Sequence, residues 1–190
     1  MNAPVPLAEG LPRRRFTVAD VLRMVEVGLI RDDERLEVLD GELVPMSPKG
    51  SRHEAIKTRI NRLWGRTCPD DADFAQETGL YLTKTTYLEP DFIVFPRSIA
   101  LADVKGPDVR LAVEVADSSL DYDLRRKPAI YASFGVRELW VIDAARRVTH
   151  LHREPGGNGY ASVEIANAAA RMQPVHAPAA LSFSLDDLRA

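Results

Sequence analysis

Four charged side chains stand where a folded sheet normally places apolar ones, and their types suit metal-assisted hydrolysis. Asp91 opens the apolar run DFIVF, Glu114 lies inside LAVEVA, Glu37 lies inside RLEVL, and Lys127 stands at the start of a helical segment. A carboxylate within an apolar strand is costly unless it is paired or bound to a cation. Converging carboxylates repel one another, and their hard oxygen atoms select magnesium or manganese over zinc.

A lysine beside such carboxylates has a natural chemical task. It can orient or help deprotonate a metal-bound water, or it can neutralise the charge that builds on an attacked phosphate. Carboxylates, a divalent ion and Lys127 together describe phosphodiester hydrolysis better than any other common chemistry. The sequence therefore predicts a metal-dependent phosphodiester hydrolase.

Each of these residues also has a structural interpretation. Asp91 can cap a turn where a strand begins, and Glu37 can face solvent on an alternating strand. Glu114 can form an internal salt bridge with Lys127 or Arg110. These interpretations predict a protein whose acidic residues serve stability alone, and the residue pattern leaves them open.

The composition is that of a globular protein of ordinary domain size. The chain has 190 residues, 45% of them hydrophobic, and a net charge of −3, which excludes disordered, collagen-like and coiled-coil proteins. No apolar run approaches the ~18 residues of a membrane span, and the first residues lack the apolar core of a signal peptide. Cys68, the single cysteine, excludes an intramolecular disulfide. We therefore expect a cytoplasmic protein without membrane contact, with a flexible arm over residues 1–15 and a single domain over residues 16–190.

The hydrophobic pattern predicts an α/β fold with a mixed β-sheet flanked by helices. Helical patterns cover residues 17–27, 51–66 and 124–134, and Asp40-Gly41 predicts a hairpin between two alternating runs. The helix between LAVEVA and ELWVID indicates that these two strands are parallel. The other predicted β elements are FAQETGLYL, DFIVF and an antiparallel pair made of VTHLHR and YASVEI. The tail ending in LSFSLDDL is expected to cover the core.

The second predicted helix carries a basic stripe beside its apolar face. At 100° per residue, its arginines group together. Such a stripe is usually a solvated surface, but beside a site that hydrolyses phosphodiesters it is a candidate for phosphate contacts that weaken with salt. The candidates for nucleic-acid binding are Arg52, Arg59, Arg62 and Arg66.

Other polar residues have weaker claims to the site. His53 falls on the apolar side of its helix, so a hydrogen-bonded inner histidine is expected rather than a metal ligand. Tyr131 lies one turn after Lys127 and is expected to be a half-buried packing residue. Both are accessory candidates. His150 and His152 share one face of a strand without a third ligand, and we expect them at the surface.

Five ordered strings resemble a known nuclease family. EPDFIVF is followed by LAVEVADSS, by a D-x-x-x-K-x-x-x-Y pattern (Asp123, Lys127, Tyr131) and by GVRELWVID; the hairpin LEVLDGELVPMSP with Ser51-Arg52-His53 precedes them. This set resembles the Uma-type branch of the PD-(D/E)XK nuclease superfamily, which contains restriction-endonuclease-like proteins. The resemblance spans Phe16 to Asp143.

The resemblance implies a restriction-endonuclease-like core in which Asp91 and Glu114 bind Mg²⁺, with Mn²⁺ as a substitute, and Glu37 is a third acidic catalytic residue that assists directly or through water. The superfamily lysine normally lies two residues after the glutamate, where this chain has Ala116. Lys127 on the next helix is then the catalytic lysine, and the Ala116 backbone carbonyl is a further candidate ligand.

The activity implied is Mg²⁺-dependent endonucleolytic hydrolysis of DNA. A homodimer is a family-level expectation, because cutting both strands usually needs two sites. The alternative is a catalytically inactive nuclease fold that binds nucleic acid or serves in an assembly. Asp117 stands where the family more often has serine, so the hydrogen bonds around the ligands can differ.

Overall fold

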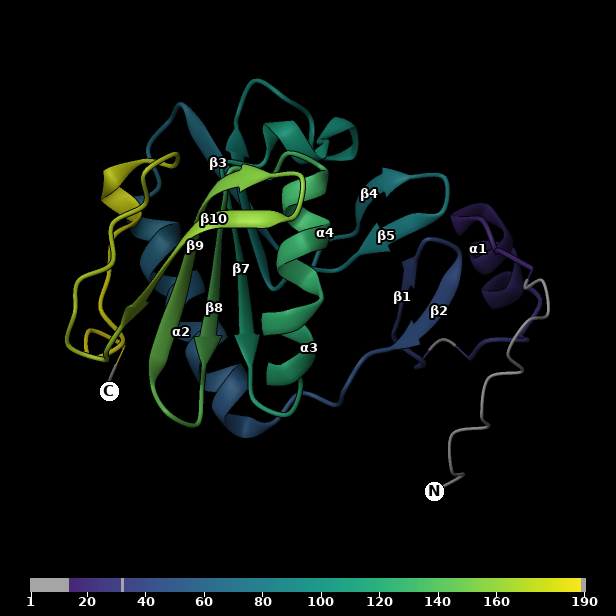
Figure 1. Ribbon diagram of the computed structural model, residues 1–190, viewed down its shortest axis with the longest axis horizontal. Helices are drawn as coiled ribbons and strands as arrows, with labels where there is room; N and C mark the ends of the chain where they lie inside the picture. The colour runs from purple at the N-terminus through teal and green to yellow at the C-terminus, as the bar shows by residue number, and fades with distance from the viewer. Residues whose placement is uncertain (1–13, 32, 189–190) are drawn as a thin grey trace.

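Two β-sheets organise the residues that the computed structural model describes, which are 14–31 and 33–188. The helices are α1 (Val18–Glu26), α2 (Ser51–Thr67), α3 (Leu120–Arg125) and α4 (Lys127–Ser133), and the strands are β1 (Leu36–Leu39), β2 (Glu42–Pro45), β3 (Ala72–Gln76), β4 (Leu80–Thr83), β5 (Thr86–Leu88), β6 (Phe92–Pro96), β7 (Leu111–Ala116), β8 (Glu138–Asp143), β9 (Val148–Gly156) and β10 (Gly159–Ala166). The larger sheet has the order β10-β9-β8-β7-β6-β3, and the smaller one has the order β2-β1-β5-β4 (Figure 1).

The larger sheet confirms the predicted mixed α/β architecture. Strands β7 and β8 are parallel, and the connection between them contains α3 and α4. The other neighbours in this sheet are antiparallel. Every residue of β7 and β8 is buried, as expected for central strands that are covered on both faces.

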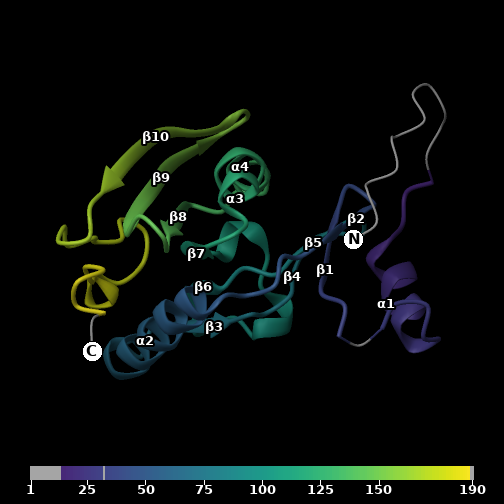
Figure 2. The same cartoon turned by 90° about the horizontal axis from the view of Figure 1, so that it is seen from below.

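Helices and the C-terminal tail cover the two faces of this sheet. On one face, Ile60 and Trp64 of α2 pack with Phe92 and Trp140, and the tail adds Phe183 to the same cluster. The opposite face packs against α3 and α4, and Figure 2 shows the sheet between these helices and α2. The tail thus covers the core, as predicted.

The smaller sheet begins with the predicted hairpin between β1 and β2. Asp40 and Gly41 have φ angles of 49° and 81°, as a two-residue hairpin turn requires. A Cβ atom at Gly41 would lie 2.5 Å from Arg15 Cβ, so a larger residue does not fit. Arg15 also donates to Asp40 Oδ1 at 2.7 Å. Of the predicted N-terminal arm, only Arg14 and Arg15 are described; the rest of that prediction falls outside the described residues.

Two predicted elements were wrong in their bounds. FAQETGLYL is not one strand: β3 belongs to the larger sheet and β4 to the smaller one, and Glu77 between them has a φ of 48° that redirects the chain. The predicted helix 124–134 is two helices separated at Arg126. The physical reason is Pro128, which has no amide hydrogen to continue the hydrogen bonds of α3 and whose ring clashes with the preceding turn. It lies in the first turn of α4, as predicted.

None of the helices in the described ranges combines the length and the hydropathy that a membrane span requires.

His152 is buried rather than at the surface, which corrects the prediction for this residue. The residue is 6% exposed, and its Nε2 atom has no hydrogen-bond partner among the described residues. Burial, with a smaller contribution from His150, lowers the pKa of His152 to about 4. The neutral imidazole is therefore favoured in the folded state.

This shift predicts an acid-sensitive contribution to stability. Because the folded pKa lies below the unfolded value of about 6.5, the contribution is complete above pH 6.5 and is lost as the pH falls toward 4. The variant His152→Leu should show a smaller fall in the free energy of unfolding between pH 7 and pH 4. Urea unfolding at several pH values measures it, with the exposed His176→Gln as control. Equal pH dependence in His152→Leu and the unmodified protein would contradict the prediction.

Candidate active site

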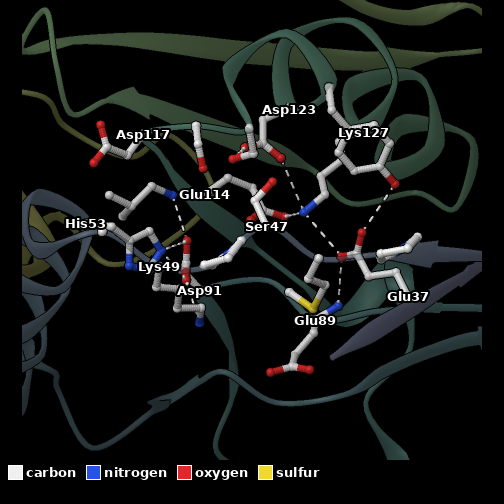
Figure 3. Close-up of a pocket in the computed structure, with 18 of the residues that line it drawn as sticks. Glu37, Ser47, Lys49, His53, Glu89, Asp91, Glu114, Asp117, Asp123 and Lys127 are labelled. Atoms are coloured by element: carbon white, nitrogen blue, oxygen red, sulfur yellow. Dashed lines mark hydrogen bonds and ion pairs between the residues drawn. The ribbon is translucent and has the colours of Figure 1, made fainter. Parts of the chain in front are cut away.

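A cleft of about 330 Å³ opens between the smaller sheet and the carboxyl end of β7, and it holds all four charged residues singled out in the sequence (Figure 3). Glu37 comes from β1, Asp91 immediately precedes β6, Glu114 lies in β7, and Lys127 is the first residue of α4. The loop between β2 and α2 forms another wall. Segments distant in the sequence thus place three carboxylates and an ammonium group in one cleft.

Lys127 joins three buried carboxylates. Its Nζ atom lies 2.8 Å from Glu114 Oε1, 3.2 Å from Glu37 Oε1 and 3.3 Å from Asp123 Oδ1 (Figure 3). Tyr131 also donates to Glu114 Oε1, at 2.6 Å. All five of these residues are buried. One ammonium group therefore faces three carboxyl groups, so the cluster has excess negative charge when all are ionised.

Burial and this charge excess shift the pKa values of the cluster. Burial raises the pKa of Glu114 to about 8, although the charge of Lys127 acts in the opposite direction. Burial likewise raises the pKa of Asp123. The pKa of Lys127 lies well above its ordinary value despite burial, because the surrounding carboxylates favour the ammonium form. The cluster therefore keeps the ammonium group and holds a proton at neutral pH, which a divalent cation can displace.

Glu37 is fixed from two sides besides Lys127. The backbone amide of Glu89 donates to its Oε1 atom at 3.2 Å, and the hydroxyl of Tyr122 donates to its Oε2 atom at 3.2 Å. Glu37 is 1% exposed, so it does not face solvent on an alternating strand.

Asp91 is held by a separate set of donors. His53 Nε2 lies 2.9 Å from Oδ1 and 3.0 Å from Oδ2, and the Val115 amide donates to Oδ2 at 2.8 Å. Lys49 Nζ lies 3.4 Å from Oδ1. Burial by itself raises the pKa of Asp91, but the hydrogen bonds and charges of these donors outweigh burial and lower it below the ordinary value. Asp91 is thus an oriented carboxylate anion.

The oxygen atoms of the cleft suit Mg²⁺. Glu114 Oε1 accepts the bonds from Lys127 and Tyr131, whereas no described residue donates to Glu114 Oε2. Within the described ranges, no group of three or more His, Cys, Asp or Glu residues is arranged to hold a metal ion. Mg²⁺ does not need one, because it keeps several waters and uses one or two carboxylates together with substrate phosphates. Asp91 and Glu114 provide such a pair.

Ala116 is placed differently from the prediction. Its carbonyl accepts a hydrogen bond from the Ala144 amide at 2.8 Å, and its side chain packs in the core on the α4 side. Val115, not Ala116, is among the described residues that line the cleft. The Ala116 carbonyl accepts a backbone hydrogen bond and Ala116 does not line the cleft, so the carbonyl is not part of the proposed ligand set.

The four arginines of α2 do not share one location relative to the cleft. Arg52 pairs with Asp117 of the cleft wall, with 2.8 Å between Nη2 and Oδ1. Arg59 donates to the Leu188 carbonyl of the tail, and Arg62 and Arg66 lie beside the tail as well. At about 1.5 Å per residue, Arg66 is about 21 Å from Arg52 along the helix axis. The structure brings only the first arginine to the cleft.

The accessory candidates have definite partners. His53 is the hydrogen-bonded inner histidine that the sequence predicted, and its partner is Asp91. Tyr131 is fully buried rather than half-buried, and its hydroxyl contacts Glu114.

Sequence reasoning gave no role to several charged residues that line the cleft, among them Asp123 and Lys49. The D-x-x-x-K spacing contained the signal for Asp123, because residues four apart share one side of a helix. No comparable signal marks Lys49, which lies in a loop.

Comparisons with known proteins found a family match and a similar fold. A family model for Uma2, described as "Putative restriction endonuclease", matches residues 18–186. A crystal structure of a "putative nuclease belonging to DUF820" from Anabaena variabilis ATCC 29413 is similar in fold, with a TM-score of 0.64 and 15% sequence identity over 91% of this chain and 97% of that chain. No curated protein matches the chain. Because the family model covers residues 18–186 of the 190, the chain belongs to the Uma2 family.

Proposed function

We propose that this protein is a Mg²⁺-dependent endonuclease that hydrolyses DNA phosphodiester bonds. The observation that carries the proposal is the convergence of Asp91, Glu114 and Lys127 in one cleft, with Lys127 bonded to Glu114 at 2.8 Å. The mixed fold and the family membership support it. For cleavage of both strands, we extend the proposal to a homodimer, in which each copy supplies one site.

The residues have separate tasks in this mechanism. Asp91 and Glu114 hold Mg²⁺, which when bound polarises a water and offsets the charge of the phosphate. His53 and the Val115 amide keep the Asp91 carboxylate oriented toward the cleft. Lys127 and Tyr131 bind Glu114 Oε1 and leave Oε2 for the metal. Glu37 fixes Lys127 from the opposite side, at 3.2 Å.

Nicking of supercoiled plasmid tests the proposal. The purified protein should convert supercoiled DNA to open-circular and linear forms when Mg²⁺ or Mn²⁺ is present and should be inactive in EDTA. The same assay with single-stranded DNA and with RNA defines the substrate. The absence of metal-dependent cleavage on all of these substrates would overturn the proposal.

One observation favours a second candidate, a nuclease fold that binds nucleic acid or serves in an assembly without catalysis. The acidic residues of the cleft are already paired, Asp91 with His53 and Lys49, and Glu114 with Lys127. Such pairing stabilises a protein without a metal. Binding of divalent metal separates the two candidates.

Calorimetric titration measures that binding. We expect the protein to bind Mn²⁺ or Mg²⁺ and the variant Glu114→Gln to bind at least about tenfold more weakly, since it loses a charged oxygen ligand. Asp121→Asn is the matched control, because Asp121 also lines the cleft but its side chain is 81% exposed. Equal metal affinity in Glu114→Gln and Asp121→Asn would show that Glu114 is not a ligand, and undetectable metal binding by the unmodified protein would favour the second candidate.

A further inference from the structure

Lys49 and Lys127 both line the cleft, but their surroundings differ. The side chain of Lys127 is 5% exposed and has three carboxylate neighbours. Moving it toward a substrate would leave those three carboxyl groups buried without their cation, which is strongly unfavourable. Lys127 is therefore built to stay where it is.

Lys49 is free of that restriction. Its side chain is 15% exposed, and it pairs with Glu77 while its Nζ atom lies 3.4 Å from Asp91 Oδ1. Glu77 has two further cationic neighbours, Lys57 Nζ at 2.8 Å and Arg35 Nη1 at 3.6 Å. If Lys49 turned away, Glu77 would thus remain paired, and Asp91 would keep His53 and the Val115 amide, so neither carboxylate would lose all its partners.

The loop that carries Lys49 is fixed at the mouth of the cleft. The next residue, Gly50, precedes α2, and a Cβ atom there would lie 2.6 Å from Asp117 Oδ2. A glycine at this position lets the loop approach the wall that follows β7. The backbone of Lys49 is thereby placed at the cleft, where its ammonium group lies beside the carboxylate of Asp91 (Figure 3).

We propose that Lys49 is the phosphate-binding lysine of this cleft. When nucleic acid binds, the ammonium group of Lys49 moves away from Glu77 and Asp91 and contacts a non-bridging oxygen of a backbone phosphate. This inference rests on the proposed nuclease function and adds a residue to it. An ammonium group at that position attracts the phosphate and offsets the negative charge that grows on its oxygens during attack. The two lysines thus have different tasks: Lys127 fixes the carboxylates, and Lys49 binds the substrate.

DNA binding in EDTA tests the proposal without catalysis. The probe is a short fluorescent duplex, titrated over a series of NaCl concentrations. Lys49→Met should weaken binding several-fold and reduce the slope of log affinity against log salt by about 1, because one phosphate contact is lost. Lys57→Met is the matched control, since Lys57 shares Glu77 but does not line the cleft. Lys49→Arg keeps the charge and should keep the slope.

Metal binding gives a second readout that distinguishes substrate binding from a positioning role. An ammonium group beside Asp91 repels a cation, so Lys49→Met should bind Mn²⁺ as tightly as the unmodified protein or more tightly. If Lys49 instead only orients Asp91, Lys49→Met should bind Mn²⁺ more weakly and keep the salt slope, which would overturn the proposal.

The outcomes also separate this proposal from the nuclease function. If Lys49→Met and Lys57→Met have equal salt slopes and the unmodified protein nicks plasmid, the role of Lys49 is refuted and the nuclease function is kept. If the salt slope changes in Lys49→Met but the unmodified protein does not nick plasmid, the nuclease function is refuted and the role of Lys49 in binding is kept. If the unmodified protein fails to bind duplex DNA, the role of Lys49 is overturned, and the nicking assay decides the nuclease function separately.

Discussion

Replacing Asp91 by asparagine should reduce metal-dependent plasmid nicking at least about 100-fold, because the variant loses a charged metal ligand and the transition-state stabilisation that depends on it. Asparagine preserves the shape of the side chain, and its carbonyl can still accept the bond from the Val115 amide. The variant therefore removes the charge with little change in packing. Single-turnover nicking rates at saturating Mn²⁺ measure the effect.

The control for this variant is Asp121→Asn, which removes a carboxylate from the cleft mouth. It should nick at the rate of the unmodified protein. Similar losses in both variants would indicate a general electrostatic effect of the cleft and contradict the role of Asp91. Nicking by Asp91→Asn at the unmodified rate would remove Asp91 from the mechanism.

The position of the site was predictable because its residues break the local pattern. Glu114 lies between valines in a strand that is buried throughout, and Asp91 opens another apolar strand. Burial of such carboxylates has to be compensated, and their convergence with a lysine was one way to compensate it. The structure places Asp91, Glu114, Glu37 and Lys127 around one cleft. Their chemical roles stay predictions.

The partners of these residues were less predictable, because they come from contacts between distant segments. Lys49 lies 42 positions from Asp91 and in a loop, where no periodicity indicates a direction. His53 could be assigned to an inner helix face but not to Asp91, which lies 38 positions away. The division of FAQETGLYL between two sheets depends on the positive φ of Glu77, a conformation that a glutamate seldom adopts.

The arrangement around Lys127 has a consequence for stability. Glu37, Glu114 and Asp123 are each buried and share this single ammonium group. Their mutual repulsion means that neutralising one carboxylate is tolerated, so Glu114→Gln should melt at an unchanged or higher temperature in the absence of metal. A fold that kept these acids for stability alone would instead lose stability in that variant.

Replacing Lys127 by methionine should have the opposite and much larger effect on stability. The variant leaves three buried carboxyl groups without a cation, and removal of one partner from a buried pair costs about 3–5 kcal/mol. For a chain of this length, that loss lowers the melting temperature by roughly 6–20 °C. Because carboxyl groups lose the penalty when they are protonated, the difference from the unmodified protein should narrow as the pH falls.

Thermal unfolding of a second, compensated variant makes this prediction specific to the cluster. Lys127→Met combined with Glu114→Gln should recover part of the lost melting temperature, since the double variant has one fewer buried ionisable carboxyl group without a cation. Mn²⁺ should likewise stabilise the single variant more than it stabilises the exposed control Lys105→Met. If the double variant were less stable than Lys127→Met alone, Glu114 and Lys127 would not be opposing charges in one buried cluster, and the mechanism that assigns Lys127 to orient Glu114 would lose its basis.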